Sequence, residues 1–511
     1  MELFMMKTFF STVFVLILSA VNAAVTPAEI SEARKILLSK QSSALQKSSA
    51  FSCLKKGAEE NLYDAVYWYA WMLYYGKGGI KADKKEAFKW FSKSAEMEHP
   101  RGLYWVGYLY AKGEGVEKNP VLARNFMQKA ADTGQVEQMR SFAYNSLHGR
   151  YFPKNMETAV IYYQKCADKN DAHSMYQLGY CYAHGKGVKR DLSKAFEFYC
   201  MAADRGDKDA QYKAAMATFF RRGTKRNDAL AFKYLSMSAA QGHLQATYRL
   251  GNCYYFGFGV KQDFAKALEL FRKAAAKGEA ESMVSIGYCF FRGLGVKQDL
   301  TKALQWYEKA AEKKSESAYL QLARIYLHGM GTEQDHQKSF YYYSLIEKGK
   351  NYQLKRISAS EIAIFYEQGI IVPKDDSKAF YYNNYAWSSK GRIKAGLALR
   401  DGIGTEKSPE KALAKFKKSV EIDNSPLGAY CAAMMMLSQK ENPPAENIQA
   451  VKYLIFAAGK KYYPAMLKLS EIYRDGLPGV PADKTEADKW SSIAGETPLL
   501  ADEYFYGSAH L

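Results

Sequence analysis

The 511-residue sequence is poor in the residue types that usually mark metal sites, reactive thiols or disulfide scaffolds. It has 8 histidines, 7 cysteines and 13 prolines. An odd number of cysteines does not fit a fully paired disulfide framework. Zincin, P-loop, EF-hand and nucleophile-elbow motifs are all missing from the chain. We therefore expect no catalytic site, no cofactor and no metal site, and the chain is predicted not to be an enzyme.

Long hydrophobic runs are also scarce, and the clearest one is at the N-terminus. Lys7 precedes an apolar run over residues 9–18, and Val21-Asn22-Ala23 fits a cleavage site after Ala23. No later segment reaches the roughly 18 apolar residues that a membrane-spanning helix needs. Residues 1–23 are thus predicted to be a signal peptide. The mature chain is expected to be exported to a bacterial periplasm or secreted, with no membrane span after cleavage.

The chain does contain a repeated unit of 36 residues, which is clearest between Ala172 and Ser315. A period in the range of about 20–50 residues indicates a stacked repeat architecture. One alanine recurs at this spacing at Ala87, Ala123, Ala159, Ala195, Ala231, Ala267 and Ala303. The series continues less regularly at Ser339, Ala379, Ala412, Ala450 and Ala487. This gives about twelve repeats.

Each repeat has the pattern of a helix, a glycine-containing loop and a second helix. Four residues before the repeated alanine lies a residue that can cap a helix N-terminus: Asp83, Asn119, Asn155, Asp191, Asn227, Asp263, Asp299, Asp335, Asp375, Ser408 and Asp483. Paired glycines precede these caps and indicate a helix C-terminus followed by a turn: Gly113/Gly115, Gly185/Gly187, Gly257/Gly259, Gly293/Gly295, Gly329/Gly331 and Gly402/Gly404. Cys181, Cys253 and Cys289 share one position on the apolar face of the first helix, so we expect them to be buried and unpaired.

The pattern Leu-Gly-x-x-Tyr-x-x-Gly-x-Gly-Val-x-x-Asp-x-x-Lys-Ala, followed by Lys-Ala-Ala, closely resembles the Sel-like repeat. That family is related to the tetratricopeptide repeat. The resemblance covers about residues 61–493, and it implies an all-α, right-handed α/α solenoid. We predict a helical cap over 24–60, regular repeats over 61–351, degenerate repeats over 352–495 and a C-terminal tail over 496–511. The resemblance further implies an adaptor or scaffold that binds other proteins.

By analogy with tetratricopeptide hairpins, three positions of each first helix should face a concave groove. They lie nineteen, fifteen and eleven residues before the repeated alanine, and an offset of four places them on one helical face. The candidate groove residues are Trp68, Tyr104, Tyr108, Lys112, Arg140, Tyr144, Tyr176, Tyr180, His184, Tyr212, Tyr248, Tyr288 and Arg292. Tyrosine gives a binding surface contact area and a hydroxyl at low entropic cost. The same tyrosines could instead pack between adjacent hairpins, and the sequence leaves both interpretations open.

The chain carries 72 Lys+Arg against 53 Asp+Glu, a formal net charge of +19. A basic surplus of this size suits an acidic protein or peptide, or an anionic component of the cell envelope, and general solubility is the alternative explanation. Nucleic acid is not expected as a partner. Our main hypothesis is a non-enzymatic scaffold that binds a protein or an extended peptide. The alternative is a peptidoglycan-binding protein, or a cell-wall or β-lactam hydrolase like the cysteine-rich branch of the family.

Overall fold

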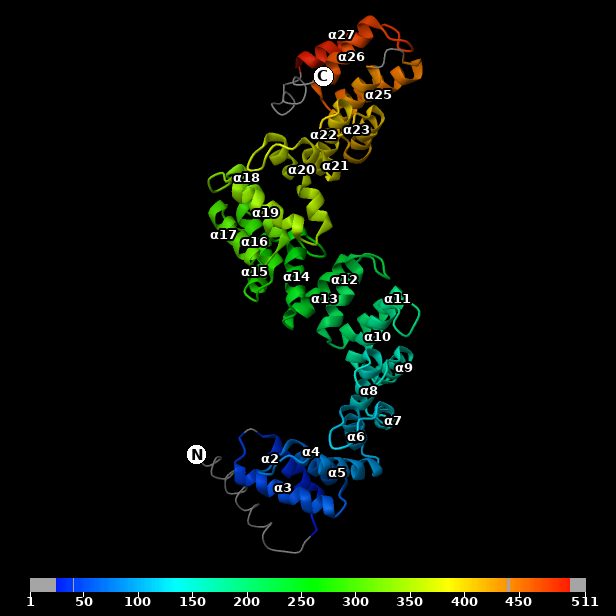
Figure 1. Cartoon of the computed structure of the whole chain (residues 1–511), viewed down its shortest axis with the longest axis vertical. Coiled ribbons are helices and arrows are strands. Elements are labelled where there is room, and N and C mark those ends of the chain that lie inside the picture. Colours follow the sequence, from blue (N-terminus) through cyan, green and yellow to red (C-terminus); the bar gives the residue numbers. More distant parts are fainter. Residues whose placement is uncertain (1–23, 40, 439–441, 497–511) are drawn as a thin grey trace. The chain divides into compact units, whose positions relative to one another are not determined.

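The computed structural model describes residues 24–39, 41–438 and 442–496. The predicted signal peptide over 1–23 lies outside these ranges, as does the predicted tail apart from Glu496. Within the described ranges the chain is a succession of helices (Figure 1). The prediction of an all-α solenoid of helix-loop-helix repeats is confirmed. No helix in the described part of the chain combines the length and apolar character needed to cross a membrane.

The chain comprises two compact units, Met1–Asp263 and Phe264–Leu511. The helices of unit 1 are α2 (Pro27–Leu38), α3 (Ala44–Glu59), α4 (Tyr63–Tyr75), α5 (Lys84–Glu96), α6 (Pro100–Lys112), α7 (Pro120–Asp132), α8 (Val136–His148), α9 (Met156–Asp168), α10 (Ala172–His184), α11 (Leu192–Asp204), α12 (Lys208–Phe219), α13 (Asp228–Ala240) and α14 (Leu244–Phe256). Those of unit 2 are α15 (Phe264–Ala275), α16 (Ala280–Arg292), α17 (Leu300–Glu312), α18 (Glu316–His328), α19 (His336–Lys348), α20 (Tyr352–Gln368), α21 (Asp376–Tyr385), α22 (Ser389–Asp401), α23 (Pro409–Asp423), α24 (Pro426–Leu437), α25 (Pro444–Gly459), α26 (Tyr463–Asp475) and α27 (Lys484–Glu496).

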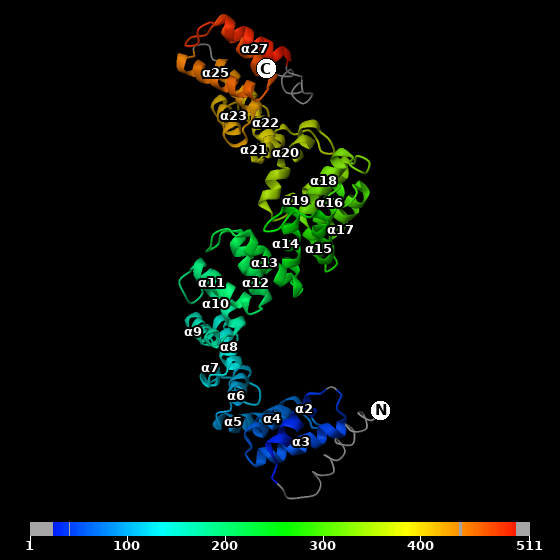
Figure 2. The ribbon, with the colours of Figure 1, turned by 180° about the vertical axis from the view of Figure 1, so that it is seen from behind.

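Successive helices pair into hairpins inside each unit. In unit 1, α4 packs on α5 and α6 on α7, and the pairing continues to α12 and α13 (Figure 2). In unit 2 the pairs run from α16 and α17 to α26 and α27. A hairpin forms even at α24 and α25, where the glycine loop of the other repeats is missing. Apolar packing between the two helices is therefore sufficient to form the hairpin without the loop signal.

Most of the predicted capping residues act as caps. Asp83, for example, accepts a hydrogen bond of 2.9 Å from the backbone N–H of Glu86, and Asp299 accepts one of 2.8 Å from Lys302. Ser408 was expected to do the same, and this expectation is wrong. Ser408 has an extended backbone at the N-cap of α23, but its side chain makes no capping hydrogen bond.

The paired glycines perform two separate tasks. The first ends the helix in the left-handed region, as at Gly185 with φ +66°. The second also has positive φ, but in addition it touches the preceding hairpin. A Cβ atom on Gly187 would lie 2.2 Å from the carbonyl oxygen of Met156, at the start of α9. The loop of one repeat thus fits against the second helix of the repeat before it.

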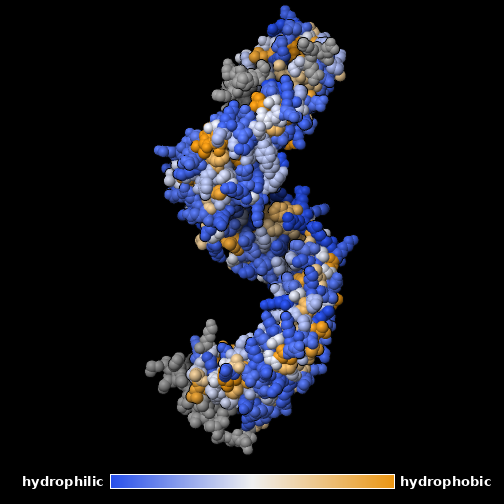
Figure 3. Space-filling model, viewed as in Figure 1, coloured by the Kyte–Doolittle hydropathy of each residue, from blue (hydrophilic) through white to orange (hydrophobic). Residues whose placement is uncertain are grey.

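Small residues on the first helices admit aromatic rings from the second. A Cβ atom on Gly179 would lie 2.7 Å from the ring of Tyr199, and one on Gly287 would lie 2.8 Å from that of Tyr307. Cys181, Cys253 and Cys289 are buried and free, as expected. The visible surface is mostly hydrophilic, with small separate hydrophobic patches (Figure 3). The core is therefore built from aligned helix faces, as the repeat spacing predicts.

Candidate functional site

Burial differs strongly along the predicted groove positions. At the N-terminal end, Trp68 on α4 is buried, and the guanidinium carbon of Arg34 on α2 lies 5.0 Å from its ring centroid. Tyr104 on α6 is half-buried, and burial raises its pKa to about 12. These two residues pack against neighbouring helices. The more open positions begin with Tyr108, one turn further along α6.

Cations lie against the tyrosines of α6 and of the loop after α8. Lys112 Nζ lies 6.0 Å from the ring centroid of Tyr108 and 5.9 Å from that of Tyr151. The guanidinium of Arg150 lies 5.3 Å from the Tyr151 ring. Arg150 and Tyr151 are loop residues that the helix-based prediction did not include. Their contacts extend the predicted surface beyond the helices.

The next two repeats place a tyrosine and a histidine one helical turn apart. The rings of Tyr144 and His148 lie 4.4 Å apart on α8, and those of Tyr180 and His184 lie 4.3 Å apart on α10. Lys186 Nζ donates a hydrogen bond of 2.7 Å to the hydroxyl of Tyr180. Burial and the charge of Lys186 lower the pKa of His148. A polar, cationic surface therefore joins α8, α10 and the loop after α10.

The remaining predicted positions fall on several helices. Arg140 forms an ion pair of 3.2 Å with Asp171, which caps α10. Tyr176 is half-buried with its ring 5.8 Å from that of Tyr199 on α11. Tyr248 lies on α14 with the guanidinium of its neighbour Arg249 5.5 Å from its ring. Tyr288 and Arg292 are exposed on α16, in unit 2.

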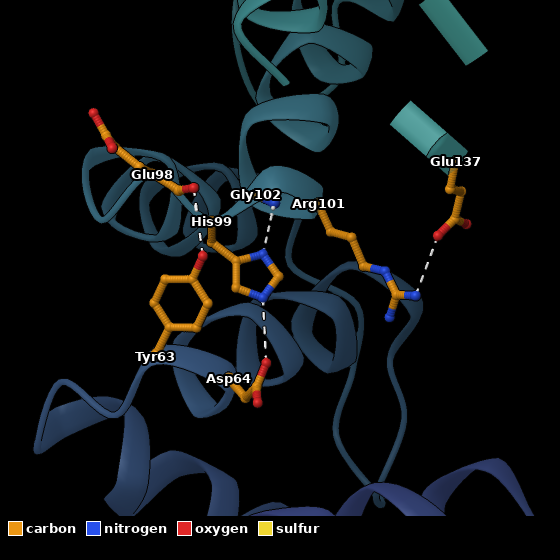
Figure 4. Close-up of polar contacts among 7 residues, drawn as sticks. All are labelled: Tyr63, Asp64, Glu98, His99, Arg101, Gly102 and Glu137. Carbon is orange, nitrogen blue, oxygen red and sulfur yellow. Dashed lines mark hydrogen bonds and ion pairs between the residues drawn. The ribbon is translucent and has the colours of Figure 1, made fainter. Parts of the chain in front are cut away.

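Polar contacts between repeats gather at the starts of the first helices (Figure 4). At the N-cap of α6, His99 Nδ1 accepts a hydrogen bond of 3.2 Å from the N–H of Gly102. Its Nε2 lies 3.3 Å from a carboxylate oxygen of Asp64 on α4. Arg101 reaches Glu137 on α8 at 3.2 Å. The neutral ring of His99 thus uses both nitrogens, one to cap its own helix and one to hold the preceding repeat.

The same arrangement recurs at His243 on α14. Ala246 N–H donates to His243 Nδ1 at 3.1 Å, and Nε2 lies 3.3 Å from Asp209 on α12. The ring stacks on Tyr212 with centroids 4.8 Å apart. Burial lowers the pKa of both histidines, against the opposing effect of the two aspartates. Protonation at Nδ1 would remove the acceptor that caps each helix.

We expect these two histidines to make unit 1 less stable in mild acid. Because their folded-state pKa lies below the ordinary value of about 6.5, the unfolded chain takes up protons that the folded chain does not. Their contribution is therefore complete above about pH 6.5 and is lost as the pH falls below it. In His99→Asn with His243→Asn, the side chain can still cap but cannot protonate. Thermal unfolding between pH 7.5 and 5 should show a smaller loss of stability in this variant than in the parent, and an equal loss would contradict the assignment.

A cleft of about 720 Å³ lies in unit 1 beside α10, α11 and α12. Two candidate groove residues, His184 and Tyr212, line it. The full lining is Ala183, His184, Arg190, Leu192, Ala195, Phe196, Tyr199, Tyr212, Lys213, Met216, Ala217, Phe220, Arg222 and Arg249. The cleft thus combines first-helix residues with residues of the second helix α11 and of two loops.

The cleft lining contains five basic residues and no aspartate or glutamate. The guanidinium of Arg222 lies 5.3 Å from the ring of Phe220, and Arg190 Nε donates to the carbonyl of Ala183 at 3.2 Å. Among the described residues, no carboxylate forms an ion pair with Arg190, Lys213, Arg222 or Arg249. A second cleft in unit 1, of about 610 Å³, is lined by Glu96, Glu98 and Asp132. This second cleft, whose lining also includes Lys129, has more acidic than basic residues, so the two clefts differ in charge.

Helical spacing alone did not identify most of this cleft. Lys213 and Arg249 follow Tyr212 and Tyr248 directly and so lie one position outside the predicted face. Arg190 and Arg222 lie in loops whose path depends on the glycine turns. A sequence signal existed in the Arg221-Arg222 pair, which occupies the loop where most other repeats have a glycine and a neutral residue. The described residues contain no group of three or more His, Cys, Asp or Glu side chains that could hold a metal ion.

The family model described as Sel1 repeat matches this chain eleven times. The matched residues are 64–99, 100–134, 141–171, 172–207, 208–243, 244–279, 280–315, 316–346, 357–382, 390–421 and 464–496. The chain belongs to the Sel1 repeat family. The segment without a match between 421 and 464 contains the α24–α25 hairpin. That hairpin has the helix pairing of the other repeats without the sequence pattern of their loop.

A solved structure shows the same fold. The crystal structure of c5321, a protective antigen of uropathogenic Escherichia coli with an SLR fold, has a TM-score of 0.65 and 21% sequence identity to this chain. That similarity covers 89% of this chain and 92% of the antigen. A Sel1 repeat protein from Oxalobacter formigenes is 27% identical with a TM-score of 0.47, covering 58% of this chain and 86% of its own. From the similarity to c5321, this Sel1 chain has the SLR fold along most of its length.

A curated relative is similar over a much shorter stretch. The chitin synthase regulator SKT5 of Saccharomyces cerevisiae is 31% identical over 75 residues. Those residues are 14% of this chain and 11% of the yeast protein. The similarity therefore spans only about two repeats. Membership of the Sel1 family is consistent with a repeat scaffold for protein interactions.

Proposed function

We propose that this Sel1 chain is a non-enzymatic scaffold that binds an acidic segment of another protein in the basic cleft of unit 1. The observation that carries the proposal is the lining of that cleft, with five basic residues and no acidic one. A carboxylate placed there gains attraction from several cations at once, and the nearby protein surface excludes part of the screening solvent. The positive charge of the cleft thus favours an aspartate or glutamate side chain of the partner.

The aromatic residues of the cleft supply contact area beside the charges. Tyr199 and Tyr212 line its wall, and Phe220 has 55% of its surface exposed. Tyrosine and arginine are the residue types that most often dominate binding energy at protein interfaces. Packing and binding are compatible for Tyr212. Its ring stacks on that of His243, and the residue also lines the cleft. An extended segment that alternates acidic and apolar side chains fits this mixture.

Export is part of the proposal and is supported by the N-terminal sequence. The apolar run over 9–18 and the small residues up to Ala23 fit a signal peptide. The mature chain would act in the bacterial periplasm or outside the cell. Determining the N-terminal residue of the protein from the native cells tests this step. We expect Ala24, and an intact Met1 would contradict export by cleavage.

Site-specific photo-cross-linking in the native cells tests the binding proposal. A benzoylphenylalanine replaces Phe220, which lines the cleft, or Ile161, which is 55% exposed on α9 and serves as the matched control. We expect a covalent adduct from position 220 only, and we expect the cross-linked partner peptide to be acidic. Equal adducts from both positions would argue against the cleft. Adducts to peptidoglycan instead of protein would favour the envelope-glycan alternative.

A further inference from the structure

Unit 2 contains a second unusual surface, at the repeat that departs from the regular length. Helix α20 has 17 residues, whereas α18 before it and α22 after it have 13 each. Helix α21 is correspondingly short, with 10 residues, and ends at Tyr385. The chain then bends so that the N–H of Trp387 donates to the carbonyl of Arg356 at 3.1 Å. The irregular length therefore brings the end of α21 against the first part of α20.

This bend encloses the guanidinium of Arg356 in aromatic rings. Its central carbon lies 5.6 Å from the ring centroid of Tyr352, 5.5 Å from that of Tyr385 and 4.9 Å from that of Trp387. Arg356 Nη1 also donates to the hydroxyl of Tyr352 at 3.1 Å. We call these four residues, together with Lys415 on α23, whose charge interacts with that of Arg356, the Arg356 patch. Stacking on rings fixes the direction of the guanidinium before any partner arrives.

The Arg356 patch has positive charges without matching negative ones. No carboxylate among the described residues forms an ion pair with Arg356 or Lys415, and Arg356 Nε has no hydrogen-bond acceptor. Burial lowers the pKa of Lys415, and so do the charges of Lys418, Arg392 and Arg356. Of these neighbours, Arg392 is already paired with Asp423. The charges that remain unpaired attract an anionic group from outside the chain.

Large aromatic side chains are exposed around these charges. Tyr352 is 54% exposed and Trp387 40% exposed, and Tyr381, stacked on Tyr385 with centroids 6.1 Å apart, is 59% exposed. A fold gains nothing from exposing so much aromatic surface in one place, whereas Trp, Tyr and Arg together are the typical composition of interface hot spots. The mixture of exposed rings and a pre-positioned guanidinium matches an apolar side chain next to a carboxylate.

We propose that the Arg356 patch is a docking site for a protein segment in which an aspartate or glutamate is adjacent to an apolar side chain. The carboxylate accepts hydrogen bonds from Arg356 and lies near Lys415, while the apolar side chain packs on Trp387 and Tyr352. This site belongs entirely to unit 2 and is independent of the cleft in unit 1. A scaffold with two such sites could hold two segments of one partner or two different partners.

A defined peptide tests the site in the full-length protein. The probe is a fluorescein-labelled peptide of alternating glutamate and leucine, and the readout is fluorescence anisotropy. All variants carry Lys213→Ser and Arg249→Ser, which weakens binding to the unit 1 cleft equally in every variant, so that differences between variants report on the Arg356 patch. We expect Arg356→Gln with Lys415→Gln to weaken binding about 30-fold, the effect of losing one hot spot. Trp387→Ala should weaken it similarly, and Arg356→Lys, which keeps the charge but loses the stacked planar group, should be intermediate.

Matched controls separate docking from general charge. Arg474→Gln with Lys468→Gln removes the same charge from α26 and should leave the affinity unchanged. Thermal unfolding of every variant identifies any that fail to fold. If Arg356→Gln does not fold, the affinity of Arg356→Lys still tests the proposal. The proposal is overturned if the double variant binds like its parent, or if a glutamine–leucine peptide binds as tightly as the glutamate one. It is also overturned if peptidoglycan is retained through Trp387 while the peptide is not.

Discussion

Replacing Gly187 by alanine is expected to destabilise unit 1 by about 4 kcal/mol, near the upper end of single-residue effects. Gly187 has φ +71°, a conformation that costs an alanine about 1–2 kcal/mol by itself. The added Cβ would also lie 2.2 Å from the carbonyl oxygen of Met156 and 2.4 Å from its carbonyl carbon. Because these are backbone atoms at the start of α9, no side-chain rotation relieves the overlap. The two hairpins must separate or the loop must move.

Gly185→Ala is the matched control for this prediction. Gly185 has nearly the same backbone conformation, with φ +66°, but its Cβ would meet nothing closer than 3.4 Å. We therefore expect only the conformational cost of about 1–2 kcal/mol. Urea unfolding measures the difference, and hydrogen exchange in α9 and α10 locates it, because repeat arrays can unfold locally. Equal losses in the two variants would mean that the contact with Met156 contributes nothing.

The contrast between these glycines shows what the sequence could predict. The repeat period, most of the capping residues and the positive φ of both glycines follow from local chemistry, and the structure confirms them. The contact of Gly187 with Met156 joins residues 31 positions apart, and nothing at either position signals it. Trp68 illustrates the same limit, since it occupies a groove position by spacing but lies beneath Arg34. The position of a side chain on its helix can be predicted from the local sequence. Whether a neighbouring helix buries that side chain cannot.

The basic cleft and the Arg356 patch were missed for related reasons. The cleft takes residues from α10, α11, α12 and α14 and from two loops, so no single helical face contains it. The Arg356 patch depends on the length of α20, which the sequence reveals only as a four-residue slip in the repeat. In both places the proposed binding site lies where the sequence or length of a repeat differs from that of its neighbours. The regular residues build the hairpins, and the irregular ones distinguish this chain from a generic array.

The second large effect is expected from charge reversal in the cleft, with Lys213→Glu and Arg249→Glu together. Each change removes an attraction and adds a repulsion toward an acidic partner, so we expect the partner's affinity to fall about 100-fold, or about 2.7 kcal/mol. The same variant should bind with a weaker dependence on salt, because fewer close charge pairs remain to be screened. Affinity is measured on the partner identified from position 220, at low and at physiological ionic strength. Neither residue forms an ion pair with a described carboxylate, so stability should change little.

Lys118→Glu with Lys154→Glu serves as the control, because it lowers the net charge of unit 1 by the same amount at exposed loop positions before α7 and α9. If the cleft recognises the partner, this control should lose affinity only through long-range attraction, by about threefold or less at physiological salt. A similar loss in both variants would instead assign binding to the overall charge of +19. The comparison thus decides between a specific site and a general property of the surface. A specific site requires that reversing the two cleft charges lowers the partner's affinity far more than reversing any other pair of equal charge.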